Sequence, residues 1–541
     1  MTKKAMALLM VAAMVLALAA CGGSASSSAA PASSAAPASS DAPASSEAPA
    51  ANPADQFADG VLVIGTGSDL LSTDPANQNQ TNSQDLFHMI GSQMFHRDLD
   101  FNIIPDLCVS YEQTDDVTWE FKIREGVKFN NGEDLTAEDV AFSYDRLIND
   151  TALVGHSYYT AFESTEVVDD YTIRVKTVAP RPDMLTLVSM SESTILPKDY
   201  VEANGIEAYM RQPVTSGMYQ LTEWVPDDHY TIVPNPDYYG ENKATWNEVV
   251  YRPIPESSTR VSELLTGGVD VIYNVPVNEW ERVGSGETHI DYGETSRVML
   301  MVTRLTEGTV TSDPKVRQAI EMAIDKTTIC EQLLQGAGTP TRTRVGSAVP
   351  GFNTDLFGDA ADLYDPEGAK ALLAEAGYNP GDITVTLTSP SGRYLMDTEM
   401  SQMIAAYLEA VGIHVNLELV DSTVMGNMFN EKTNKELFLI GLSDAQYDGC
   451  YPLAHYGDKA RVAGQTDYDN PKVQELYQQA LVELDPEKKE ALEREIQAIA
   501  ADERPHICIA QLKAAFGVNN GLEIHPRMDS NGMADEITIA K

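Results

Sequence analysis

Strand and helix patterns alternate along the chain from residue 60 onward, and this alternation restricts the possible folds most strongly. Residues 61–64 form a short apolar run typical of a buried strand, and residues 119–123 alternate apolar and polar side chains as a half-buried strand does. Similar strand patterns occur at residues 171–175, 230–233, 383–387, 413–420 and 438–442. Strands that alternate with helices of ordinary length predict an α/β fold.

The ends of the helical segments are marked by residues that favour helix starts and stops. Thr136 and Asp139 have the spacing of a capping box, so a helix is predicted from there through Leu147. Prolines begin two further helices and glycines end two: these are Pro314, Pro366, Gly377 and Gly412. The charged residues 475–500 predict one or two surface helices. No internal repeat and no second long apolar segment is seen in the sequence.

Residues 1–20 have the pattern of a signal peptide. Two lysines precede residues 5–20, an apolar run shorter than the roughly 20 residues of a transmembrane helix. The run ends Leu18-Ala19-Ala20-Cys21, which resembles the lipobox of bacterial lipoproteins. The resemblance implies that Cys21 is lipidated and anchors the protein to the extracytoplasmic face of the cell membrane. An ordinary signal peptide with a chance cysteine at the cleavage site is the alternative.

The segment from Cys21 to residue 56 is rich in Ser, Ala and Pro and predicts a disordered linker, because it has too few apolar side chains to form a core. The whole chain of 541 residues carries 81 acidic and 37 basic side chains, a formal net charge of −44. Such a charge repels phosphate backbones and anionic lipids, so nucleic-acid binding is excluded and the lipid must hold the protein at the membrane.

The cysteine spacing and the search for catalytic motifs point to no metal site and no known class of enzyme. Four cysteines are scattered through the body without zinc-site spacing, and buried thiols are favoured over one or two disulfides: they are Cys108, Cys330, Cys450 and Cys508. Nucleophile-elbow, zinc-protease and P-loop motifs are absent from the sequence. We therefore predict no cofactor, no metal site and no enzymatic activity.

One segment of the sequence is far more informative about function than these motifs. Residues 121–143 read FKIREGVKFNNGEDLTAEDVAFS, a strand, a glycine turn, a second strand and a capped helix. This segment closely resembles the signature of the family 5 extracellular solute-binding proteins, the peptide- and nickel-binding components of bacterial ABC importers. Further similarities follow in the family's order at residues 72–75, 105–107, 215–219, 235–239, 268–271, 316–326, 374–378, 411–413 and 468–471. Ser216 and Met218 depart from the family's usual Thr and Pro.

The resemblance implies an α/β periplasmic-binding-protein-like fold with two lobes, a hinge and an extra subdomain. Domain I is then discontinuous, and the three domains have these bounds: 57–84, 199–290 and 485–541 for domain I, 85–198 for domain II, and 291–484 for domain III. A ligand bound between the lobes closes them.

The resemblance also implies a contact for the ligand. In peptide-binding members, an Asp a few residues after a Gly-Trp pair on a domain III strand binds the α-amino group of the peptide. Here the sequence is Gly441-Leu442-Ser443-Asp444, so Asp444 is the nearest match, one residue early, and Leu442 replaces the Trp. Asp448 is the second choice, and a loop-capping role for Asp444 is the alternative.

Other residues are expected at the cleft. Arg393 lies in a Gly/Pro loop after a strand, where its guanidinium can bind a carboxylate. The alternative is an exposed loop arginine or an interlobe salt bridge. The Arg that some peptide-binding members carry just before the Gly-Trp pair is replaced by Leu439, which weakens a tripeptide assignment. From domain I, the expected contacts are Asp69, Leu70, Ser216, Gly217 and Met218.

Taken together, the sequence predicts a lipid-anchored, monomeric substrate-binding protein of an ABC importer that delivers a short peptide to a permease and its ATPase. A nickel chelate, an oligosaccharide or another small solute is the second substrate class. A secreted hydrolase, or a sensor or adhesion protein without transport, is the competing class of function.

Overall fold

The computed structural model describes residues 56–70, 72–78, 81–391, 393–444, 446–529 and 532–540. The predicted signal peptide, Cys21 and the linker up to residue 55 lie outside the described residues. None of the described helices is long and apolar enough to cross a membrane.

A single mixed sheet runs through the folded body in the order β15-β14-β16-β12-β17-β11-β1-β10-β9-β8, with β13 paired to β17 beside this path. Its bounds are β1 (Val61–Thr66), β8 (Tyr219–Val225), β9 (His229–Pro234), β10 (Glu248–Pro253), β11 (Val271–Tyr273), β12 (Thr288–Thr303), β13 (Gly338–Pro340), β14 (Ile383–Pro390), β15 (Ile413–Val420), β16 (Leu437–Leu442) and β17 (His506–Asn519). Strand β1 is parallel to β10 and β11, and β14 is parallel to β15 and β16. Parallel pairs need helical crossovers, which is the architecture that the alternating patterns predict.

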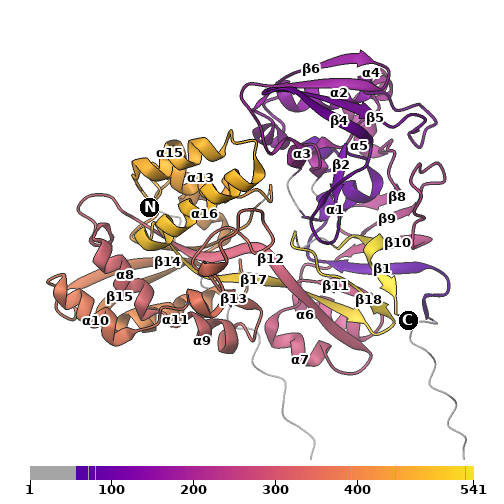
Figure 1. Cartoon of the computed structure of the whole chain (residues 1–541). Helices are drawn as coiled ribbons and strands as arrows, with labels where there is room; N and C mark the ends of the chain where they lie inside the picture. The colour runs from indigo at the N-terminus through magenta and orange to yellow at the C-terminus, as the bar shows by residue number, and fades with distance from the viewer. Residues whose placement is uncertain are drawn as a thin grey trace, which may run out of the picture. The chain divides into compact units, whose positions relative to one another are not determined.

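Two long antiparallel strands, β12 and β17, connect the two lobes (Figure 1). In the first lobe, Lys513–Asn519 of β17 pairs with Thr288–Glu294 of β12, and the end of β17 also pairs with β11. In the second lobe, β12 pairs with β16, and β17 pairs with β13. The pairing is interrupted between Glu294 and Val298. A second register shift falls between Met299 and Leu300, so the lobes are joined by a continuous sheet with two irregular positions.

The first lobe combines its part of the mixed sheet with a smaller antiparallel sheet of order β4-β5-β7-β6. The smaller module contains β2 (Phe95–Arg97), β3 (Ile103–Pro105), β4 (Cys108–Asp115), β5 (Thr118–Ile123), β6 (Phe162–Asp169), β7 (Thr172–Thr177), α2 (Ala137–Asn149), α3 (Met184–Leu187), α4 (Lys198–Asn204) and α5 (Ile206–Arg211). Helices α1 (Thr81–Ile90), α6 (Ser257–Leu265) and α7 (Trp280–Val283), and the short strands β18 (Leu522–Glu523) and β19 (Thr538–Ile539), complete the lobe. Separate apolar cores fill the two modules.

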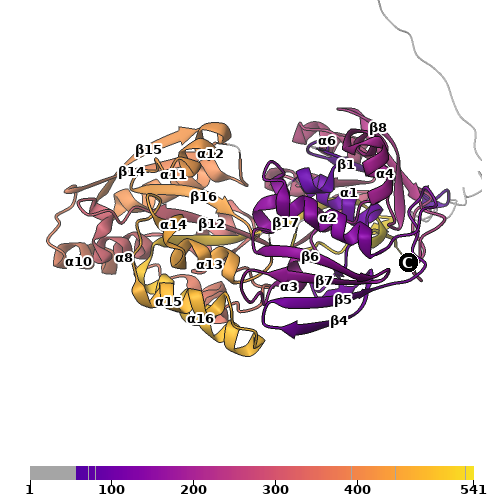
Figure 2. The ribbon, with the colours of Figure 1, turned by 90° about the horizontal axis from the view of Figure 1, so that it is seen from above.

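The second lobe packs helices around β14, β15 and β16 (Figure 2). The helices of the second lobe are α8 (Pro314–Ala323), α9 (Lys326–Thr328), α10 (Pro366–Glu375), α11 (Asp397–Ala410), α12 (Ser422–Asn430), α13 (Cys450–Gly457), α14 (Lys459–Val462), α15 (Pro471–Ala480) and α16 (Pro486–Glu503). Helices α13, α15 and α16 share a core of their own, with Leu453, Val473 and Ile496 fully buried.

Most local predictions are confirmed. Strand β15 has the predicted bounds, and α2 begins with the capping box of Thr136 and Asp139. Gly377 and Gly412 follow helices with φ of 93° and 89°, values that glycine adopts without strain. The four cysteines of the body are buried free thiols, as favoured. The expected α/β fold is confirmed as well.

The domain boundaries taken from the family pattern differ from the packing at several points. Boundaries at residues 84, 198 and 290 fall inside α1, α4 and β12. Helix α16, expected in domain I, packs on α13 and α15 of the second lobe because its apolar side chains, including Ile496 and Ala500, are covered there. The exact domain limits remain a prediction.

Candidate functional site

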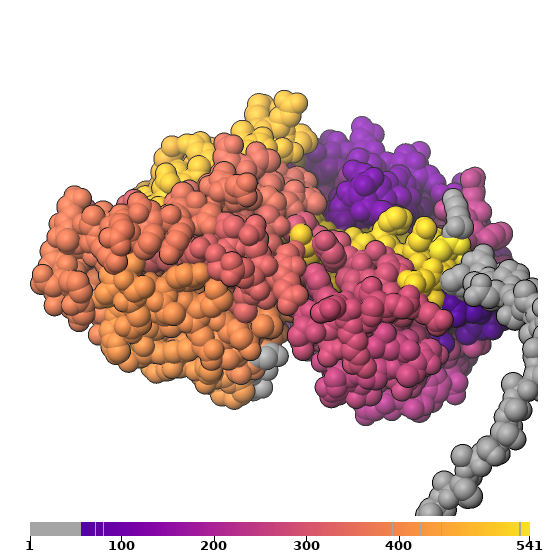
Figure 3. Space-filling model, turned by 90° about the horizontal axis from the view of Figure 1, so that it is seen from below, coloured from indigo at the N-terminus to yellow at the C-terminus, as the bar shows by residue number. Residues whose placement is uncertain are grey.

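Two adjoining cavities lie where the lobes meet. The first, of about 330 Å³, is lined by α1, by the segment after α3, by Ser443 and Asp444 after β16, and by residues 527–529 near the C-terminus. The second, of about 680 Å³, is lined by the segment from Asn274 to Trp280, by residues 393–396 and by β17. In Figure 3 the surface is hollowed between the orange second lobe and the magenta part of the first. These volumes are in the range of small-molecule sites.

The first of the two irregular positions in β12, at residues 295–297, lies between these cavities. Thr295, Ser296 and Arg297 stand opposite the single residue Leu512 of β17. The hydroxyl of Thr295 donates to the carbonyl oxygen of Leu512 at 2.8 Å and so holds the bulge in place. Thr295 and Arg297 line both cavities. A bulge re-aims side chains that a regular strand would place elsewhere, and here it turns β12 into a wall of the cleft.

Asp444 is a buried carboxylate in the wall of the first cavity, with only 1% of its surface exposed. Its Oδ1 accepts hydrogen bonds from the backbone N–H groups of Gln446 and Tyr447, at 2.9 and 2.7 Å, so it caps the loop. Its Oδ2 is buried and has no hydrogen-bond partner among the described residues. Burial, reinforced by the charge of Asp448, raises the pKa of Asp444 to about 8. The side chain thus has one structural oxygen and one unsatisfied oxygen.

The loop that carries Asp444 is also held by the first lobe. Arg97, at the end of β2, donates to the carbonyl oxygen of Gln446 at 3.3 Å and to the hydroxyl of Thr186 at 3.2 Å. Its guanidinium lies over the rings of Phe101 and Tyr447, and these rings are 4.7 Å apart. Residues distant in sequence therefore bridge the lobes beside Asp444.

The expected contacts from domain I lie elsewhere. Asp69 accepts hydrogen bonds from the indole N–H of Trp224 at 3.2 Å and the backbone N–H of Asp227 at 2.8 Å, so it ties its loop to the β8–β9 hairpin. Leu70 is buried in the apolar core of the first lobe. Neither residue lines either cavity.

Ser216, Gly217 and Met218 serve the packing of α1. The hydroxyl of Ser216 donates to that of Ser92 at 3.0 Å, and the N–H of Gly217 donates to the carbonyl oxygen of Ile90 at 2.8 Å. Met218 is half-buried against the first-lobe core. None of the three lines either cavity. The motif that pointed to them thus coincides with a close contact between a loop and a helix end.

The expected residues of the second lobe are divided between the cavities and the core. Ser443 and Asp444 line the first cavity, and Arg393 lines the second. Gly441 lies in β16 opposite Met299, and a Cβ there would come within 2.9 Å of the ring of Tyr394. Leu442 is half-buried in a small core. The cleft therefore combines Arg393, Ser443 and Asp444, and leaves the other expected residues outside.

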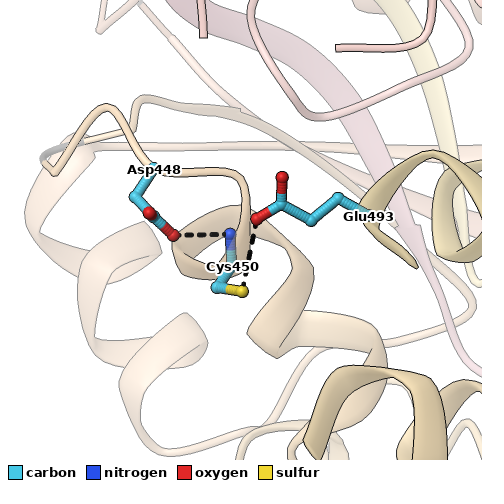
Figure 4. Close-up of side chains that lie close together, drawn as sticks. All are labelled: Asp448, Cys450 and Glu493. Carbon is cyan, nitrogen blue, oxygen red and sulfur yellow. Dashed lines mark hydrogen bonds between the residues drawn. The ribbon is translucent and has the colours of Figure 1, made fainter. Parts of the chain in front are cut away.

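A buried group of possible metal ligands lies just beyond this loop (Figure 4). A carboxylate oxygen each of Asp448 and Glu493 and the sulfur of Cys450 lie within 4.8 Å of one another. The ammonium of Lys489 contacts Asp448 and lies 3.2 Å from Glu493. Burial raises the pKa of Cys450 well above its usual value, whereas a metal requires the thiolate. The group is an ion-pair network in which the lysine already supplies the cation.

Comparison with known proteins identifies the family. Residues 102–464 match the family described as bacterial extracellular solute-binding proteins, family 5, middle. The chain belongs to this family. The glutathione-binding protein GsiB of Salmonella typhi is 25% identical over 456 residues, which cover 82% of this chain and 88% of that protein. The resemblance stated from the sequence is thus confirmed.

Solved structures have the same fold as this family 5 solute-binding protein. DppA of Helicobacter pylori, in complex with the peptide STSA, is 24% identical with a TM-score of 0.72, covering 89% of this chain and 98% of that one. NikA of Brucella suis, in complex with Fe(III)-EDTA, is 22% identical with a TM-score of 0.78, covering 89% and 100%. The expected periplasmic-binding-protein-like fold with two lobes is therefore confirmed.

Sequence reasoning missed several residues that line the cavities, above all Arg97, Asn274 and Arg297. Arg297 begins an apolar run that reads as the start of a strand, so the sequence gives little indication of the bulge before it. Thr295 and Ser296, two small polar residues ahead of that run, are the only hint in the sequence.

Proposed function

We propose that this family 5 protein captures a short peptide between its lobes and delivers it unaltered to the permease of an ABC importer, whose ATPase subunits supply the energy. The protein works as an extracytoplasmic monomer, anchored to the membrane through a lipid on Cys21. It performs no chemistry on the solute. The peptide-bound DppA and the glutathione-binding relative support the substrate class.

The observation that carries the proposal is the unsatisfied Oδ2 of Asp444. An unpartnered buried carboxylate oxygen is costly, and a ligand that donates to it recovers that cost. The α-amino group of a peptide is a cationic donor that fits this oxygen, because charge-assisted hydrogen bonds are about twice as strong as neutral ones. Ser443, beside Asp444 in the same wall, offers a hydroxyl to the same end of the ligand.

The test compares peptides with and without a free amino group. Native mass spectrometry of the purified protein with a mixed di- to pentapeptide library should show retention of free peptides and loss of their N-acetylated forms. Asp444→Asn should lower the affinity about tenfold or more. Asp134→Asn, at an exposed carboxylate in the smaller sheet module, is the matched control and should bind as wild type does. Equal retention of acetylated peptides would remove the role of Asp444.

A metal chelate is the second candidate solute, and His88 favours it. His88 lines the first cavity, and burial together with the charge of Arg527 lowers its pKa to about 4. Its imidazole is thus neutral at pH 7 and able to coordinate the metal of a bound chelate. A co-purified metal in the native mass spectrum, lost in His88→Ala, would favour this candidate over the peptide.

Transport and catalysis predict different fates for the solute. We expect the solute recovered by denaturation to have the same mass as the one added, after hours of incubation. A recovered hydrolysis product would instead support the competing secreted hydrolase.

A further inference from the structure

Arg297 is a cation in the cleft whose guanidinium has no hydrogen-bond or ion-pair partner among the described residues. Its side chain is exposed to the cleft, and it lines both cavities. Within the described part of the chain, its guanidinium makes no hydrogen bond and no ion pair, and the guanidinium carbon lies 5.7 Å from the centre of the ring of Tyr394. A guanidinium has five donors, so this side chain keeps its full capacity to bind an anion.

The wall around Arg297 has an unusual charge for this protein. The residues that line the second cavity include Arg297, Arg393 and Lys513, and they include no Asp or Glu. The whole chain, by contrast, has 81 acidic and 37 basic residues. Lys513 forms an ion pair with Glu294 at 3.9 Å, and Glu294 does not line this cavity. The cavity is thus a positive site within a strongly negative molecule.

The two arginines lie on the same aromatic ring. The guanidinium carbons of Arg297 and Arg393 are 5.7 and 5.4 Å from the ring of Tyr394. Two cations on one ring repel each other, and an anion between them would relieve that repulsion.

We propose that the second cavity binds a carboxylate of the solute, with Arg297 as the residue that recognises it. This inference rests on the proposed function and sharpens it: the solute carries an ammonium that faces Asp444 and, at its other end, a carboxylate that faces Arg297. Arg297 borders both cavities and Asp444 lines the first, so both groups can face a single solute. The planar fork of an arginine binds a carboxylate with two parallel hydrogen bonds, which lysine cannot do.

The experiment compares free acids with amides. Mixed tripeptides, and the same tripeptides with amidated C-termini, compete for the full protein in native mass spectrometry. Wild type should retain the free acids at least tenfold more strongly than the amides. Arg297→Gln should reduce this preference to less than about threefold, and Arg297→Lys should fall between, because it keeps the charge and loses the fork. Arg211→Gln, at an exposed arginine on α5, is the matched control and should behave as wild type.

Each outcome of this experiment either supports or overturns one of the two proposals. Equal retention of acids and amides by wild type, or an unchanged preference in Arg297→Gln with a wild-type melting curve, overturns the inference. N-acetylated tripeptides retained as well as free ones would refute the role of Asp444 and leave Arg297 intact. A mixture of non-peptide di- and tricarboxylates is offered in parallel. If only the di- and tricarboxylates are retained, and Arg297→Gln loses them, the solute is not a peptide but the carboxylate site is supported. If neither peptides nor carboxylates are retained, both proposals are overturned.

Discussion

The two oxygens of Asp444 have different environments, and this difference has a consequence for pH. One oxygen caps the loop and the other has no partner among the described residues. With its pKa raised to about 8, mainly by burial, the empty site is protonated at pH 7. An ammonium placed against it favours the charged carboxylate, so binding must expel the proton.

We therefore predict that binding of a peptide at pH 7 releases close to one proton. The raised pKa means that affinity for an ammonium increases as pH rises from about 6 towards 8, where the carboxyl of the empty site loses its proton. Calorimetry in two buffers of different ionisation enthalpy measures the release. Asp444→Asn should abolish it, and a release that persists in that variant would assign the proton to another group.

Gly217 shows a purely steric requirement at the scale of one residue. A Cβ at this position would lie 2.4 Å from the carbonyl carbon of Ile90. We predict that Gly217→Ala lowers the free energy of unfolding by about 1–3 kcal/mol or more, because backbone cannot move aside cheaply. Gly67→Ala is the control, since its Cβ would meet nothing closer than a side-chain atom at 3.6 Å. Urea denaturation of both variants checks the difference, and equal stability would contradict the packing.

At the scale of elements, one buried carboxylate joins four parts of the second lobe. Glu321 of α8 lies 3.0 Å from the ammonium of Lys326 and from Nε of Arg342, and 2.6 Å from Nε of Arg504. Burial alone would raise the pKa of Glu321, but the three cations hold it at about 2. The charge of this carboxylate therefore stabilises the junction of α8, α9, β13 and the end of α16.

We predict that Glu321→Gln lowers the free energy of unfolding by about 3–5 kcal/mol, because it leaves buried cations without a counter-charge. The depressed pKa also means that its stabilisation is complete above the unfolded value, near 4.3, and is lost as pH falls towards about 2. Urea denaturation between pH 7 and pH 3 measures both effects. The exposed pair of Lys315 and Glu375 supplies the control Glu375→Gln, which should change stability little. A variant at Glu321 as stable as that control would refute the network.

At the scale of the whole folded body, β12 and β17 carry both the connection between the lobes and one wall of the cleft. The bulge at residues 295–297 interrupts their pairing beside the cavities. A bulged ribbon bends more easily than a regular one, so we infer that lobe closure is absorbed there. Only a solute that contacts both lobes can drive that closure.

Spin labels at Glu207→Cys on α5 and Glu367→Cys on α10 should report this closure, because both positions are exposed and lie in different lobes. Cys21 is replaced by Ala for this experiment. We expect the distance distribution from pulsed electron resonance to shift to shorter values when the solute found by native mass spectrometry is added. Labels at Glu367→Cys and Lys472→Cys, both in the second lobe, should not move. A shift in this control pair would place the motion within the lobe instead.

The sequence by itself determined the elements and the family. Caps such as Thr136 with Asp139, and strand patterns such as residues 413–420, depend on neighbours a few positions away, so local physics is enough to predict them. The position of Asp444 at the cleft was implied by the resemblance to peptide-binding members of the family, and the structure does put it in the cavity wall. Its ligand remains a proposal.

Only the tertiary structure decided which residues share the cleft. Ser296 and Asp444 are 148 positions apart and Arg97 and Gln446 are 349 apart, yet each pair is hydrogen-bonded. The bulge that exposes Arg297 exists because β12 is paired with β17, more than 200 positions later in the chain. Such contacts depend on burial and register across the whole sheet, and no local pattern records them. For the same reason Ser216 and Gly217, singled out by their motif, prove to lie beneath the helix end and outside the cavities.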